Sequence, residues 1–304
     1  MIPVCGDVIY VGMMKIETFY EQDSGTWTYL LADPATGRAA VIDPVWTFDP
    51  VSGRAGREFI DRVLGAARAA GYGIDWVLET HAHADHLSAG ALVRDETGAR
   101  IAIGRGICRV QENFKRVFNL ESLATDGSQF DRLLQEGDML NVGELELSVI
   151  ETPGHTDDSI TYVVGDAAFV GDTLFAPGYG TARCDFPGGD AGRLFDSIQK
   201  LYALPGSTRL YLCHDYPEGD AQPVCSVTVD ESRAHNQHVS DDTRREDYVQ
   251  MREARDATLG LPRLILPSLQ VNVLAGQAPP PESNGFSYLK LPFNTTLKEL
   301  LKRH

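Results

Sequence analysis

The sequence is poor in basic residues. Its 304 residues include 27 Lys and Arg against 43 Asp and Glu, which gives a formal net charge of −16 at pH 7. A protein that binds nucleic acid or an anionic membrane surface needs a local excess of positive charge. The composition therefore excludes a general polyanion-binding protein, and we expect neither a nucleic-acid nor a membrane partner.

The sequence also lacks segments that direct a chain to a membrane. No run approaches the roughly 18 consecutive apolar residues that a transmembrane helix needs. The first seven residues contain no basic segment followed by an apolar stretch, which a secretory signal requires. We therefore expect a cytoplasmic protein.

Cysteines are few, and no pattern pairs them. Their number is odd, their spacing is irregular, and no C-x-x-C pair occurs. Such usage predicts free buried thiols. The five are Cys5, Cys108, Cys184, Cys213 and Cys225.

Short β-prone runs alternate with segments of helical periodicity. The runs 26–31 and 39–42 flank a turn rich in Pro and Gly and predict a hairpin. Apolar residues recur at helical spacing over 59–67 and stop before Gly71, and a strand follows at 74–79. Further strands are predicted at 101–103, 145–150, 161–164, 168–170 and 209–213, and further helices near 87–96, 110–117 and 194–201. This order predicts an α/β protein of two sheets covered by helices, a single domain over 1–304 in which 226–304 form a C-terminal extension packed on it.

The segment Thr80–His86 concentrates metal-binding side chains. His81, His83, Asp85 and His86 all fall within it, and imidazole and carboxylate groups bind zinc, iron and manganese. In an extended segment His81 and His83 point the same way, and the start of a following helix would bring Asp85 and His86 to a neighbouring position. One loop could therefore supply two adjacent metal positions.

Three more candidate ligands follow other predicted strands. His155 lies in a turn fixed by Pro153 and Gly154, while Asp172 and His214 each follow a β-prone run. The remaining histidines, 235, 238 and 304, are expected to be structural, and Asp43 is expected to form a turn or to support a ligand.

The H-x-H-x-D-H motif, with His155, the pair Gly171-Asp172 and His214 spaced as here, resembles the metallo-β-lactamase superfamily over about residues 10–220. The resemblance implies an αββα sandwich of two mixed β-sheets flanked by helices, with the metal site along one edge. The same scaffold supports lactamases, thioesterases, nucleases and oxygenases, so the reaction is a separate question.

Two further stretches, Arg183–Phe186 and His214–Tyr216, resemble the persulfide dioxygenases within this superfamily. The resemblance implies one Fe(II) per chain, held by His81, His155 and Asp172, and oxidation of glutathione persulfide by dioxygen to sulfite and glutathione. Two imidazoles and one carboxylate leave three metal positions open for substrate and dioxygen. The family often forms dimers, so the resemblance also implies a homodimer.

If the protein is such a dioxygenase, the other ligand-type residues orient ligands and water through hydrogen bonds. These residues are His83, Asp85, His86 and His214. In dizinc relatives the same residue types fill a second metal position. The alternative is therefore a dizinc hydrolase of glutathione thioesters, similar to glyoxalase II, and the sequence leaves iron or zinc and one ion or two open. A third hypothesis is a non-catalytic metal-binding or redox-sensing module.

Glutathione carries two carboxylates, and a protein with this net charge needs a local cation to bind them. Arg183 is the candidate, because it matches the family's Arg-x-Asp-Phe position and a guanidinium can bind a carboxylate with two hydrogen bonds. The alternative is a structural pair with Asp185. Tyr179 and Tyr216 are further candidates for substrate contacts, whereas Cys184 is expected to pack in the interior.

Overall fold

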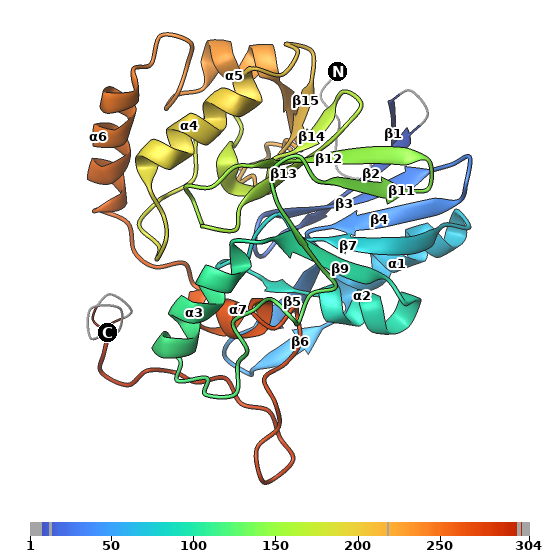
Figure 1. The fold of residues 1–304 in the computed structure, drawn as a ribbon, viewed down its shortest axis with the longest axis vertical. Helices are drawn as coiled ribbons and strands as arrows, with labels where there is room; N and C mark the ends of the chain where they lie inside the picture. The colour runs from blue at the N-terminus through green and yellow to red at the C-terminus, as the bar shows by residue number, and fades with distance from the viewer. Residues whose placement is uncertain (1–7, 12–13, 218, 297–298, 300–304) are drawn as a thin grey trace.

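Two β-sheets lie face to face in the computed structural model, and helices cover both outer faces (Figure 1). The structure describes residues 8–11, 14–217, 219–296 and 299, so Cys5 and His304 lie outside it. This four-layer arrangement confirms the predicted αββα sandwich of two mixed β-sheets flanked by helices.

The first sheet has the strand order β1-β2-β3-β4-β7-β9-β10. Strands β1 to β4 pair antiparallel, and β4, β7, β9 and β10 pair parallel. The strands are β1 (Val8–Val11), β2 (Met14–Glu21), β3 (Thr26–Asp33), β4 (Arg38–Ile42), β7 (Gly73–Leu78), β9 (Arg100–Gly104) and β10 (Arg132–Leu134).

The second sheet has the order β11-β12-β13-β14-β15-β16 and is also mixed, because only β14 and β15 pair parallel. Its strands are β11 (Met139–Val142), β12 (Leu145–Glu151), β13 (Ile160–Val164), β14 (Ala167–Phe169), β15 (Arg209–Tyr211) and β16 (Ser226–Thr228). A small third sheet joins β6 (Arg54–Gly56), β5 (Val45–Asp49) and β8 (Leu87–Ser88).

Helices on the first sheet are α1 (Glu58–Ala69), α2 (Gly90–Thr97) and α3 (Ile107–Val117), and α7 (Ile265–Asn272) lies beside β8. On the second sheet lie α4 (Ala191–Tyr202) and α5 (Val229–His235), and α6 (Arg245–Asp256) packs against α4. A capping box of Thr228 and Glu231 begins α5, and the Asp190 side chain caps α4. Such caps supply acceptors for the first free N–H groups of a helix.

Three hydrophobic clusters hold the layers together. Strand β3 shows the principle, because all of its residues are buried. Trp27, Tyr29 and Leu31 face the second sheet, whereas Leu30 and Ala32 face the helices on the other side. Successive side chains point to opposite faces of a strand, so both faces of this strand are buried between the second sheet and the helices.

The hairpin of β3 and β4 and the helices α1, α3 and α4 confirm their predictions. The helix predicted near 87–96 is wrong at its start, because Leu87 and Ser88 form β8 and the helix begins at Gly90. In the part of the chain that the structure describes, no helix has the length and apolar character to span a membrane.

Candidate metal centre

Four strands end at the same edge of the sandwich, and each is followed by candidate ligands. The loop after β7 contains His81–His86, and the segments after β12, β14 and β15 contain His155, Asp172 and His214. Gly154 makes one of these turns possible. Its φ is +140°, and a Cβ there would lie 2.3 Å from the backbone nitrogen of Leu194. Only glycine combines this conformation with so close an approach.

The first cluster, which we name the three-ligand group, consists of His81, His155 and Asp172. Their ligand atoms lie within 4.8 Å of one another, and all three side chains are buried. The Oδ2 atom of Asp172 lies 3.8 Å from Nε2 of His81 and 3.5 Å from Nε2 of His155. The structure therefore brings together the three residues that the resemblance implies as iron ligands.

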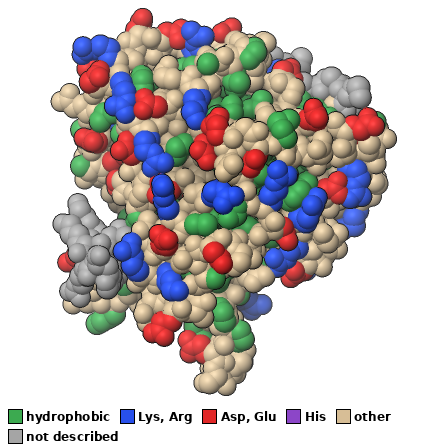
Figure 2. All heavy atoms as spheres, in the orientation of Figure 1, with side chains coloured by type: hydrophobic (Ala, Val, Ile, Leu, Met, Phe, Trp, Pro, Cys, Tyr) green, Lys and Arg blue, Asp and Glu red, His purple; other side chains and the backbone are tan. Residues whose placement is uncertain are grey.

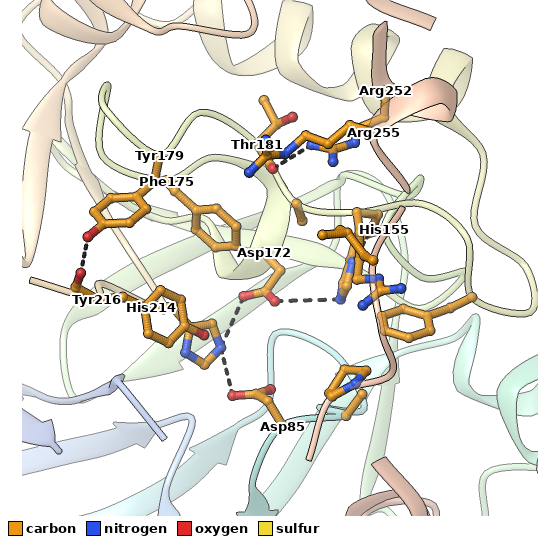
Figure 3. A pocket seen from close by; sticks show the side chains of 16 residues that line it. Asp85, His155, Asp172, Phe175, Tyr179, Thr181, His214, Tyr216, Arg252 and Arg255 are labelled. Atoms are coloured by element: carbon orange, nitrogen blue, oxygen red, sulfur yellow. Dashed lines mark hydrogen bonds and ion pairs between the residues drawn. The ribbon is translucent and has the colours of Figure 1, made fainter. Parts of the chain in front are cut away.

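The second cluster, the four-ligand group, consists of His83, Asp85, His86 and His214, again within 4.8 Å. Nε2 of His214 lies 3.2 Å from Oδ2 of Asp85 and 3.3 Å from Oδ1 of Asp172 (Figure 3). Asp172 thus presents one carboxylate oxygen to each group. This places a carboxylate between two sets of ligands.

Buried atoms without hydrogen-bond partners show that a metal fits these residues. Buried polar atoms nearly always have a partner, and leaving one unpaired costs about 1–3 kcal/mol. Here several such atoms gather in the two groups, and all are ligand atoms. They are Nε2 of His81, Nδ1 of His83, Nε2 of His86, Nε2 of His214 and Oδ1 of Asp172. Cations between them would satisfy these lone pairs.

The opposite ring nitrogens are held by hydrogen bonds that leave the ligand nitrogens free. Nδ1 of His155 donates to the backbone carbonyl of Arg183 at 2.7 Å. A carbonyl only accepts, so Nε2 of this ring carries the lone pair. Nε2 of His83 lies 3.0 Å from Oδ1 of Asp43, and this bond leaves Nδ1 to face the four-ligand group. Burial lowers the pKa of His81 and His83, which keeps both rings in the neutral form that binds metals.

Asp43 holds the start of the metal-binding loop through hydrogen bonds. Its carboxylate accepts hydrogen bonds from the backbone N–H and the hydroxyl of Thr80, at 2.8 and 2.9 Å, in addition to contacting His83. Burial raises the pKa of Asp43 to about 6. The residue thus ties the start of the metal-binding loop to the end of β4.

A pocket opens over the two groups. Its metal side is formed by Asp85, His155, Asp172 and His214. The outer part is lined by apolar side chains and by three arginines (Figure 3). These outer residues include Phe175, Tyr179, Arg183, Phe186, Tyr216, Arg252, Arg255 and Leu259. A mostly apolar pocket with a few converging polar groups is typical of a small-molecule site.

The predicted substrate contacts all line this pocket. Arg183, however, forms two hydrogen bonds with Asp185, at 2.7 and 2.8 Å, and lies over the ring of Phe186. The structural pair that the sequence left open is therefore present. Tyr216 stacks on His214 with an interplanar angle of 7°, and the Tyr179 hydroxyl donates to the backbone carbonyl of Tyr216.

Sequence reasoning missed the residues that α6 and α7 bring to the centre. Arg252 and Arg255 line the pocket, and Asn272 contacts the metal-binding loop. These residues lie in polar or mixed helical segments without a chemical motif. His238, expected to be structural, accepts a hydrogen bond from the backbone N–H of Thr181 at the pocket wall.

Comparison with known proteins agrees with this geometry. The model of the metallo-beta-lactamase superfamily matches residues 22–214, which include all seven residues of the two groups. The chain belongs to this superfamily and is a metal-dependent enzyme of its kind.

Several relatives match most of the chain. A probable metallo-hydrolase of Burkholderia pseudomallei is 49% identical over 92% of this chain and 99% of its own length. Glyoxylase B2 of Dictyostelium discoideum is 42% identical over 92% of this chain and 97% of its own. The mitochondrial persulfide dioxygenase ETHE1 of Bos taurus is 30% identical over 73% of this chain and 74% of its own.

Among solved structures, ETHE1 from Myxococcus xanthus superposes with a TM-score of 0.69 and 31% identity, covering 86% of this chain and 99% of that one. The superfamily predicted from the motifs is thus confirmed. Relatives with greater identity bear names such as metallo-hydrolase, beta-lactamase hydrolase-like protein and glyoxylase, and ETHE1 is more distant.

Proposed function

We propose that the protein is a dinuclear metal hydrolase that cleaves a thioester of glutathione or a similar small anionic thiol. The observation that carries this proposal is the position of Asp172 between the two ligand groups. A carboxylate with one oxygen toward each of two ligand sets is suited to bridge two metal ions, and paired ions are common in hydrolases.

Two bound ions would supply an activated water and would polarise the carbonyl of the thioester. The residues of the three-ligand group would hold one ion and those of the four-ligand group the other. Phe175 and Phe186 line the pocket beside them and exclude bulk water. Tyr216, stacked on His214, lines the pocket as well.

Arg255 is our candidate for the cation that binds a substrate carboxylate. Arg183 and Arg252 are neutralised by Asp185 and Asp256, whereas Arg255 has no ion-pair partner among the residues that the structure describes. It lines the outer pocket and is exposed, so its guanidinium can reach an incoming anion. The name hydroxyacylglutathione hydrolase of a Rhodospirillum rubrum relative that is 35% identical also supports a glutathione-linked substrate.

The test uses zinc-loaded protein and S-lactoylglutathione. We expect hydrolysis that depends on the second zinc equivalent. Arg255→Ala should raise KM about tenfold or more, because a charge-assisted hydrogen bond contributes about 1.5–3 kcal/mol, and should leave kcat nearly unchanged. Arg244→Ala, at the exposed residue just before the same helix, is the matched control. Absence of thioester hydrolysis at two bound ions would overturn the proposal.

A second candidate is an Fe(II)-dependent dioxygenase that oxidises glutathione persulfide to sulfite and glutathione. It is favoured by the three-ligand group, which offers two imidazoles and one carboxylate, and by the 31% identity to the ETHE1 structure. Oxygen uptake by iron-loaded protein with glutathione persulfide tests it. Uptake no greater than that of metal-free protein would exclude this candidate.

We also propose a single domain with its C-terminal extension packed on it, and a homodimer. Strand β16, at the start of that extension, pairs with β15 of the second sheet. Light scattering on purified protein measures the mass in solution, and a monomer at micromolar concentration would contradict the dimer.

A further inference from the structure

Helix α7 ends against the loop that carries most of the metal ligands. Its last residue, Asn272, is buried, and its side chain reaches the backbone of that loop. The amide nitrogen donates to the carbonyl of His83 at 2.8 Å and to the carbonyl of His86 at 2.9 Å. The amide oxygen accepts from the backbone N–H of Ser88 at 2.8 Å.

These bonds fix the orientation of the amide. An Asn side chain has two donors and one acceptor group, and a flipped amide would direct its oxygen at both carbonyls and its N–H at Ser88. The single arrangement therefore satisfies both donors and the acceptor. No other residue type offers two donors and an acceptor on so short a side chain.

The close approach of the following chain reinforces the contact. Gly276 has a φ of +81°, and a Cβ there would lie 2.8 Å from the carbonyl oxygen of Ser88. The segment 272–276 therefore packs closely against the end of the metal-binding loop. A shift of the backbone at His83 or His86 would break the hydrogen bonds to Asn272.

The residues bridged by Asn272 belong to one group of ligands. His83, Asp85 and His86 supply three of the four ligands in the four-ligand group, and both carbonyls that Asn272 binds belong to them. In the three-ligand group, His155 and Asp172 come from other segments. His155 is held instead by the carbonyl of Arg183.

We propose that Asn272 is a positioning residue that holds the metal-binding loop in the geometry of the four-ligand group. It acts through the backbone of His83 and His86, without touching the metal or the substrate. Removing partners that orient ligands weakens metal binding by about 10- to 100-fold. The proposal rests on the two-ion centre of the proposed function but not on the reaction that this centre catalyses.

The test compares two isosteric variants on the same helix. Asn272→Asp keeps the acceptor for Ser88 but turns a second oxygen toward the two carbonyls. Gln270→Glu is the matched control, because Gln270 is also buried and bonds to Leu266 and Lys290, away from the metal centre. Metal-free protein of each variant is titrated with zinc ions against a competing chelator, and folding is followed by circular dichroism.

We expect Asn272→Asp to bind one zinc ion with nearly unchanged affinity and the other about 10- to 100-fold more weakly, with both affinities unchanged in Gln270→Glu. Equal affinities in Asn272→Asp and the wild type would overturn the proposal. Equal weakening of both ions, or loss of folded protein in Asn272→Asp alone, would also overturn it, since either would make Asn272 a general structural residue. Hydrolase activity is not needed for this measurement, so its absence would count only against the proposed function.

Discussion

A buried ion pair on α6 gives the sharpest test of how the C-terminal segment supports the centre. Arg252 and Asp256 are 1% and 5% exposed, and their closest N–O contact is 2.6 Å. Arg252 also donates to the carbonyl of Thr181 at 3.1 Å, and Asp256 accepts from the backbone N–H of Cys184 at 2.7 Å. The pair therefore holds both ends of the segment 181–184. The carbonyl of Arg183 within this segment orients His155.

The expected cost of breaking this pair is large. Asp256→Asn leaves the buried charge of Arg252 without a counter-charge, and such a change costs about 3–5 kcal/mol. Domains of this kind have only about 5–15 kcal/mol of unfolding free energy. Replacing both partners by apolar residues, Arg252→Met with Asp256→Leu, removes both charges and should restore part of the stability, since the Thr181 carbonyl and the Cys184 N–H still lose their partners.

Metal binding should behave differently from stability. The apolar double variant cannot bond to Thr181 or Cys184, so the segment that orients His155 is released. We expect zinc affinity to stay about tenfold or more below that of the wild type even though part of the stability returns. Urea unfolding of metal-free protein measures the stability, and zinc titration measures the zinc affinity.

The control is the exposed pair Arg244–Asp247 at the start of the same helix, with side chains 73% and 55% exposed. Asp247→Asn should leave the unfolding free energy nearly unchanged, because water and salt screen an exposed ion pair. The reasoning is refuted if Asp256→Asn lowers the free energy of unfolding no more than Asp247→Asn does. Wild-type zinc affinity in the apolar double variant would refute the positioning role.

Three further predictions concern single residues. Burial, together with nearby arginines, lowers the pKa of His238 to about 4, so the folded state binds fewer protons than the unfolded state between about pH 4 and 6.5. Stability should fall by about 1–2 kcal/mol as the pH is lowered through that window, after allowing for solvent screening, and His238→Gln should remove this slope in urea titrations. Burial raises the pKa of Asp158 to about 6, so ionisation disfavours the folded state; metal-free protein should lose up to about 3 kcal/mol as the pH rises from about 4 to 6, and a slope that survives in Asp158→Asn would contradict this cause. Gly154→Ala should prevent the turn before His155 from forming, because its Cβ would meet Leu194, and we expect little folded protein or zinc affinity reduced about tenfold or more; unchanged zinc binding would contradict the argument.

Much of the centre could be predicted from the sequence because its ligands follow strands in short motifs. His81, His155, Asp172 and His214 each come directly after a β-prone run, and polar residues at strand ends gather at one edge of a sheet. The resemblance to a known superfamily then fixed the number and order of layers, which periodicity alone leaves open.

The missed features depend on contacts between distant segments. Asn272 reaches the metal loop across 189 positions of sequence, and nothing in its own helix distinguishes it from a structural amide. Arg252 and Asp256 read as an ordinary i, i+4 pair on a polar helix, and only the fold shows that they are buried. The start of the helix near Leu87 was misplaced because pairing of β8 with β5 outweighs local helical spacing.

On the face shown in Figure 2, acidic and basic side chains are interspersed over the surface. The acidic residues behind the net charge of −16 are therefore not gathered into one patch on this face. Local cations such as Arg255 can bind an anionic substrate despite the overall charge, because salt screens exposed charges beyond a Debye length of about 8–10 Å.

The most direct test of the central claim is a crystal structure of zinc-saturated protein with anomalous data at the zinc edge. The account predicts about two ions per chain, one in each ligand group, with Asp172 bound to both. A single ion held by His81, His155 and Asp172, with the four-ligand group empty at saturating zinc, would contradict it.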